Sequence, residues 1–123
     1  NEYDVTYIPD NQLHTSDSQK TSKQEFIDFC KGTEVLIHDC QYTKEDMPEK
    51  KDWGHSLDSD TIDLAIQANV KKLVLFHHDP TRSKDDILAI VENCKRIAPE
   101  IDVSAAKEQT EYQLLGTKHT QQL

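Results

Sequence analysis

The chain has 123 residues, which suits one domain with its own core, and no apolar run approaches the roughly 20 residues that span a bilayer. Its net charge of −9 disfavours a nucleic-acid interface built from this segment alone, because phosphate contacts need clustered Lys and Arg, but leaves open a phosphate substrate held by metal ions. Its three cysteines form no CxxC pair, so we expect reduced thiols in a cytoplasmic protein rather than a disulfide framework or a zinc ribbon.

The first part of the chain is predicted to form a strand, a helix and a second strand. Residues 2–9 alternate loosely between polar and β-favouring residues, which indicates a short strand. A capping box before an apolar run predicts a helix at 22–31 that stops at Gly32. An apolar strand follows at 34–37. The charged loop at 41–55 is longer than a connection requires, and loops of that length are often functional.

The second part continues the alternation of helix and strand. Apolar residues share one face of a predicted helix at 58–69, which leads into a strand at 72–76. An acidic capping box opens the most regular helix, which extends from 83 to about 98. Short strands are predicted at 101–104 and 111–115. Strands that alternate with helices are an α/β order, and short apolar strands imply a sheet covered by helices.

Polar side chains follow three of the predicted strands at the point where each strand ends. They are Asp10, His38, Asp39, His77, His78 and Asp79. Ligand groups in α/β sheets collect beyond the strand ends, so these residues could line one edge, and His55 before the second helix is placed to join them. Imidazoles and carboxylates are the ligand set of zinc, manganese or iron, so one constellation could bind metal and move protons.

Four segments carry a resemblance to a known family: Tyr7-Ile-Pro-Asp10, Leu36-Ile-His-Asp39, Gly54-His-Ser56 and Leu73-Val-Leu-Phe-His77. Their order resembles the second half of the metallo-β-lactamase fold, most closely in the ribonuclease Z-like phosphodiesterases. The resemblance implies the C-terminal half of an αββα sandwich, with strands and helices in the order β-α-β-α-β-α-β. It would occupy residues 1–116, with 117–123 as a polar tail.

The resemblance also implies site residues and a reaction. Asp10 would be the aspartate that bridges two divalent metal ions, zinc first and manganese or iron as alternatives, and His77 would be a further ligand. Asp39, in place of the family's glutamate, and His55 would form the pair that hands a proton to the leaving oxygen. The implied activity is hydrolysis of a phosphodiester or a related ester, with both RNA and a small phosphodiester open as the substrate.

The family's first metal motif, HxHxDH, does not occur in these 123 residues. The resemblance therefore implies that an N-terminal half, in the same protein or in another chain, completes the site, and that this chain alone is inactive. Because residue 1 is Asn rather than Met, we expect a processed, cut or partial polypeptide. The protein could also form a homodimer. No membrane partner is expected.

Other interpretations of the same residues remain open. The chain could be a non-catalytic interaction or regulatory module that retains the half-fold, or an unrelated doubly wound α/β domain with a mononuclear ion. Asp10 could form a turn after Pro9, and His55 could merely open the following helix. His38 is expected to be a packing group. Because adjacent strand residues point to opposite faces, His77 and His78 are not both expected to face a metal.

Overall fold

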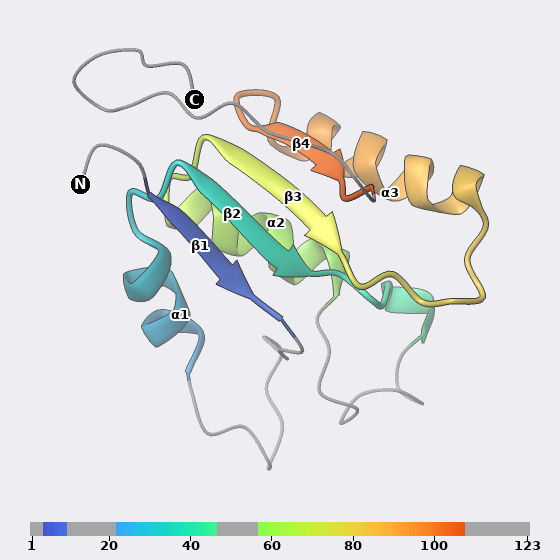
Figure 1. Cartoon of the computed structure of the whole chain (residues 1–123), viewed down its shortest axis with the longest axis horizontal. Helices are drawn as coiled ribbons and strands as arrows, with labels where there is room; N and C mark the ends of the chain where they lie inside the picture. The colour runs from blue at the N-terminus through green and yellow to red at the C-terminus, as the bar shows by residue number, and fades with distance from the viewer. Residues whose placement is uncertain (1–3, 10–21, 47–56, 108–123) are drawn as a thin grey trace.

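The computed structural model describes residues 4–9, 22–46 and 57–107 (Figure 1). Its elements are β1 (Val5–Ile8), α1 (Lys23–Cys30), β2 (Val35–Asp39), the 3-10 turn η1 (Lys44–Asp46), α2 (Asp58–Gln67), β3 (Lys72–Phe76), α3 (Lys84–Ile97) and β4 (Asp102–Ala105). This order confirms the predicted α/β class. The predicted strand at 111–115 and the predicted boundary between 116 and 117 lie outside the described residues.

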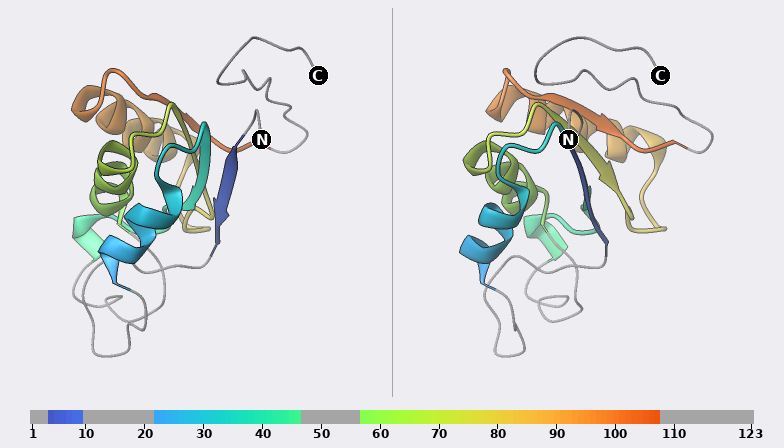
Figure 2. Two further views of the ribbon diagram at one scale, coloured as in Figure 1. Left: turned by 90° about the vertical axis from the view of Figure 1, so that its left-hand side faces the viewer. Right: turned by 60° about the vertical axis from the view of Figure 1, so that its left-hand side comes forward.

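The four strands form one parallel sheet in the order β1-β2-β3-β4. Each strand is joined to its neighbour by a helix, and right-handed crossovers that always advance in the same direction place their helices on the same face. Figure 2 shows α1, α2 and α3 together on one side of the sheet. This sequential order differs from a doubly wound sheet, in which the order reverses and helices cover both faces. The doubly wound alternative is therefore wrong.

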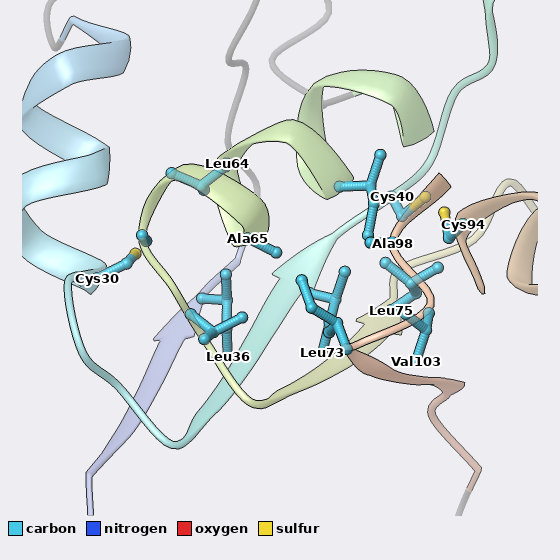
Figure 3. Close-up of a cluster of buried hydrophobic side chains, with 14 of the residues drawn as sticks. Cys30, Leu36, Cys40, Leu64, Ala65, Leu73, Leu75, Cys94, Ala98 and Val103 are labelled. Carbon is cyan, nitrogen blue, oxygen red and sulfur yellow. The ribbon is translucent and has the colours of Figure 1, made fainter. Parts of the chain in front are cut away.

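The core lies between the sheet and its three helices. Leu36, Leu73, Leu75 and Val103 come from neighbouring strands in register and are almost fully buried against the helices (Figure 3). Two of the helices begin where the sequence predicts, since Ser22 and Ser83 each close a capping box with the residue three positions on. Within the described ranges, no helix is long and apolar enough to cross a membrane.

The opposite face of the sheet is also apolar. Tyr7, Ile37 and Val74 are in register across β1, β2 and β3, and the Tyr7 ring lies 5.3 Å from that of Phe76. None of the three helices packs on this face (Figure 2). Tyr7 is 58% exposed there, whereas Val74 is 1% exposed. A sheet with helices on one side and an apolar second face is suited to pack against another sheet.

Candidate active site at the carboxyl edge of the sheet

Asp39 and His77 meet at the edge where the parallel strands end. Asp39 is the last residue of β2 and is in register with Phe76, the last residue of β3, so His77 follows directly beside it. The distance between Asp39 Oδ2 and His77 Nδ1 is 3.7 Å. The aspartate side chain is fully buried, whereas the His77 side chain is 40% exposed. Two of the four residues that the sequence assigns to the site are thus brought together.

His77 adopts a left-handed backbone conformation, with a φ of 57°. A residue other than glycine enters this region only when its surroundings hold it there, and such residues concentrate at functional sites. The turn also ends the simple alternation of side chains along β3, so that His77 lies near Asp39. Its ring stacks on Phe76 with the centroids 6.1 Å apart. The conformation of His77 is therefore set by contacts on both sides.

The Asp39 carboxylate is held in place by the chain that follows it. Its Oδ1 accepts a hydrogen bond of 3.0 Å from the backbone N–H of Gln41. The ladder between β2 and β3 continues past the strands, because Cys40 N donates to the Phe76 carbonyl oxygen at 2.9 Å. Asp39 therefore has a fixed orientation toward the end of β3, as expected for a residue that orients an imidazole.

His38 lies on the other face of the sheet, beneath α2. It is fully buried, and its Nδ1 donates to the carbonyl oxygen of Asp39 at 2.7 Å. The hydroxyl of Thr61 on α2 donates to the same carbonyl oxygen at 3.0 Å. Burial lowers the pKa of His38, although the Asp39 carbonyl and carboxylate oppose this effect. His38 is a packing residue, as the sequence predicts.

The buried His38 ring is expected to make the protein less stable in mild acid. Because burial lowers its pKa below the ordinary 6.5, the unfolded chain binds protons more readily than the native one as pH falls through that value. Stability is thus retained above the unfolded pKa and lost below it. His38→Gln should reduce the loss of unfolding free energy between pH 7.5 and pH 5.5, measured by urea denaturation.

The matched control for this measurement is His78→Gln, because burial also lowers the pKa of His78. That variant should retain the share of the pH dependence that belongs to His38. Equal pH dependence in the native protein and in His38→Gln would contradict the prediction.

His78 differs from its neighbour His77 in its surroundings. Both of its ring nitrogens are buried, and burial lowers its pKa, although the Leu75 backbone opposes this effect. Nδ1 of His77 lies 3.7 Å from Asp39 Oδ2, whereas the ring nitrogens of His78 hydrogen-bond to no side chain within the described ranges.

The residues just after β2 pair with the residues just before α2. Tyr42 and Leu57 form an isolated parallel bridge, and Asp58 N donates to the Tyr42 carbonyl oxygen at 3.0 Å. The Tyr42 side chain is 1% exposed, so this pairing is anchored in the interior. Tyr42 was not among the predicted site residues, because its only local signal is an aromatic residue just after a strand.

Arg82, in the turn between β3 and α3, was also not among the predicted site residues. Its guanidinium reaches the β2–α2 segment, where Nη2 lies 2.5 Å from Asp46 Oδ2. The signal available in the sequence was its position a few residues after the strand that ends at His77. Its partner could not be read from the sequence, because the two residues are 36 positions apart.

The other two predicted site residues, Asp10 and His55, lie outside the described residues. In the sequence, Asp10 follows the end of β1 by two positions, and His55 precedes Leu57 by two positions. Residues 4–9, 22–46 and 57–107 contain no group of three or more His, Cys, Asp or Glu side chains that could hold a metal ion. The assigned roles of Asp10, Asp39, His55 and His77 remain predictions.

Comparison with known proteins gives sequence relatives and fold neighbours. No protein-family model matches the chain. The chain is 34% identical over 89 residues to Ribonuclease Z of Archaeoglobus fulgidus, which is 69% of this chain and 27% of that protein. It is 34% identical over 77 residues to Ribonuclease Z of Saccharolobus solfataricus, or 63% of this chain and 25% of that one. The chain thus spans about a quarter of the length of these curated relatives.

Two solved structures share the fold. The metallo-β-lactamase fold protein YhfI from Bacillus subtilis matches with a TM-score of 0.62 and 22% identity, over 84% of this chain and 36% of that one. Human tRNase Z, short form (ELAC1), matches with a TM-score of 0.52 and 18% identity, over 80% of this chain and 30% of that one. At such identities the likeness concerns the fold, and it agrees with the parallel sheet and its three helices. The chain is a ribonuclease Z-like protein with the metallo-β-lactamase fold, and it matches part of the length of its relatives.

Proposed function

We propose that the chain is part of a metal-dependent hydrolase of the phosphodiesterase type, with its active site at the carboxyl edge of the sheet. The sequence relation to Ribonuclease Z supports this class of reaction. The single observation that carries the location is the contact between Asp39 and His77, where β2 and β3 end side by side. Sites in α/β sheets lie beyond such strand ends.

Asp10 and His77 are the proposed metal ligands. An imidazole and a carboxylate suit zinc first, with manganese and iron as alternatives. The fit is supported by the Asp39 carboxylate, which lies 3.7 Å from His77 Nδ1, since a carboxylate beside one ring nitrogen is the usual support of a metal-binding histidine. Two divalent ions would supply activation of water near neutral pH and positive charge for the phosphoryl oxygens.

Asp39 and His55 are the proposed proton-transfer pair. The oxygen that leaves a phosphodiester needs a proton, and a histidine oriented by a carboxylate is a suitable general acid. Asp39 is buried and fixed by the Gln41 N–H, which gives it the rigidity that such a role requires. Its position beside His77 further suggests that one carboxylate orients groups on both the metal side and the proton side of the site.

The remaining ligands are proposed to come from an N-terminal half that carries the HxHxDH motif, in the same protein or in another chain. The apolar sheet face around Tyr7 and Phe76 is suited to pack against it. A homodimer is the alternative arrangement. RNA and a small phosphodiester are both candidate substrates. We also propose a cytoplasmic location, since Cys30, Cys40 and Cys94 are free, buried thiols.

The test uses the complete protein that contains this chain. It should hydrolyse bis-p-nitrophenyl phosphate or a precursor tRNA, lose this activity on chelation and regain it when zinc or manganese is restored. A complete, folded protein that turns over neither substrate under any of these metals would favour the alternative of a non-catalytic interaction module.

A further inference from the structure

Arg82 links the two segments that follow β2 and β3. Its Nη2 donates to Asp46 Oδ2 at 2.5 Å and to the carbonyl oxygen of Gln41 at 3.4 Å. Arg82 itself belongs to the turn after His77, where its backbone N–H donates to the Asp79 carbonyl oxygen at 3.0 Å. A single side chain therefore ties the turn after β3 to two points on the segment after β2.

Both of these points are connected to the candidate site. The backbone N–H of Gln41 donates to Asp39 Oδ1, and the Gln41 carbonyl oxygen accepts from Arg82. Arg82 therefore hydrogen-bonds to the residue that orients the Asp39 carboxylate. Asp46 also accepts a hydrogen bond of 2.8 Å from the backbone N–H of Thr43, which ties the end of η1 to the residue that precedes it. A continuous series of hydrogen bonds thus runs from Arg82 to Asp39.

The Arg82–Asp46 ion pair is more enclosed than the Lys23–Asp63 ion pair. The two side chains are 16% and 22% exposed, against 35% and 44% for Lys23 and Asp63, which join α1 to α2. Arg82 Nε is buried without a hydrogen-bond partner within the described ranges. Burying a charge with an unpaired donor is a poor source of stability, and it fits a residue kept for geometry.

We propose that Arg82 is a positioning residue. It would fix the segment that carries Asp39 and Gln41, on the proton-transfer side of the active site, relative to the turn after His77, on the metal-binding side. The inference rests on the proposed function. Arginine suits this role because the two hydrogens of Nη2 point in fixed directions in the guanidinium plane and can each meet one acceptor, whereas the lysine ammonium is a point charge on a flexible stem. Asp46 and the Gln41 carbonyl are the two acceptors.

The kinetic test compares two substrates in the complete protein. When an RNA phosphodiester is cleaved, the leaving group is a ribose oxygen that needs a proton. The leaving group of bis-p-nitrophenyl phosphate is p-nitrophenolate, which departs readily without one. Arg82→Ala and Asp46→Asn should lower kcat on a precursor tRNA about tenfold or more beyond their effect on bis-p-nitrophenyl phosphate. Arg82→Lys should lie between the native protein and Arg82→Ala. The matched control, Lys23→Ala, removes a more exposed ion pair and should affect both substrates equally.

A second measurement does not depend on activity. The backbone N–H groups of Gln41 and Thr43 should exchange with deuterium severalfold faster in Arg82→Ala than in the native protein, and Lys23→Ala should leave them unchanged. Unchanged exchange in Arg82→Ala and Arg82→Lys would overturn the positioning role, and so would equal loss on the two substrates. A native protein with no activity would instead refute the proposed function, while the exchange rates would still test whether Arg82 holds this segment.

Discussion

Replacing His77 with alanine is expected to lower the activity of the complete protein by more than about 100-fold, because loss of a residue that only supports a ligand already costs about 10–100-fold. The fold should survive, since the His77 side chain is 40% exposed and its removal opens no cavity in the core. The measurement is kcat/KM on a phosphodiester together with metal content by elemental analysis. Both should fall.

The adjacent histidine gives the control for this prediction. His78 has two buried ring nitrogens that hydrogen-bond to no side chain among the described residues, so His78→Gln breaks no side-chain hydrogen bond in this part of the chain. It should retain metal and most of the activity. If His78→Gln lost metal while His77→Ala kept it, the assignment of the ligand would be reversed. If both variants kept full activity, neither histidine would be a ligand.

Asp39→Asn is expected to lower activity about 10–100-fold, which is the usual effect of losing a carboxylate that orients a histidine. Asparagine has nearly the same shape, and its amide oxygen can still accept the Gln41 N–H, so the fold should change little. The loss should be larger on RNA than on bis-p-nitrophenyl phosphate, because Asp39 is proposed to support the proton donor. Steady-state kinetics on both substrates measure this difference.

The control for Asp39 is an aspartate at the opposite edge of the sheet. Asp102 begins β4 and lies 3.5 Å from Lys72 Nζ, far from the carboxyl ends of the strands. Asp102→Asn should leave kinetics on both substrates unchanged. Activity in Asp39→Asn equal to that of Asp102→Asn would remove Asp39 from the mechanism.

The parts of the fold that were predictable from sequence depend on local signals. The capping boxes at Ser22 and Ser83 set the starts of two helices, and apolar runs marked β2 and β3. Boundaries set by long-range pairing were less accurate. The second strand extends to Asp39, beyond the predicted end at residue 37, because Asp39 pairs with Phe76 on the neighbouring strand.

The second helix shows the opposite error. It was predicted to reach residue 69, but it ends at Gln67 because Asn69 adopts a φ of 56°, the left-handed conformation that stops a helix. Asparagine near a helix end is a known signal for this conformation, and apolar periodicity alone does not detect it.

The candidate site was predictable in its residue types and only partly in its contacts. The position of strand-end residues indicated that Asp39 and His77 would share an edge, since parallel strands end together. The left-handed backbone of His77 and the Arg82–Asp46 pair depend on tertiary contacts and had no sequence signal of their own. Such contacts join segments that are distant in sequence, which local patterns do not encode.

The most direct test of a metal-dependent phosphodiesterase is the metal content of the complete protein, purified without added metal and measured by elemental analysis. The proposed site predicts two divalent transition-metal ions per complete chain, reduced in His77→Ala. A complete, folded protein with no stoichiometric transition metal, and no uptake of zinc, manganese or iron on titration, would contradict it.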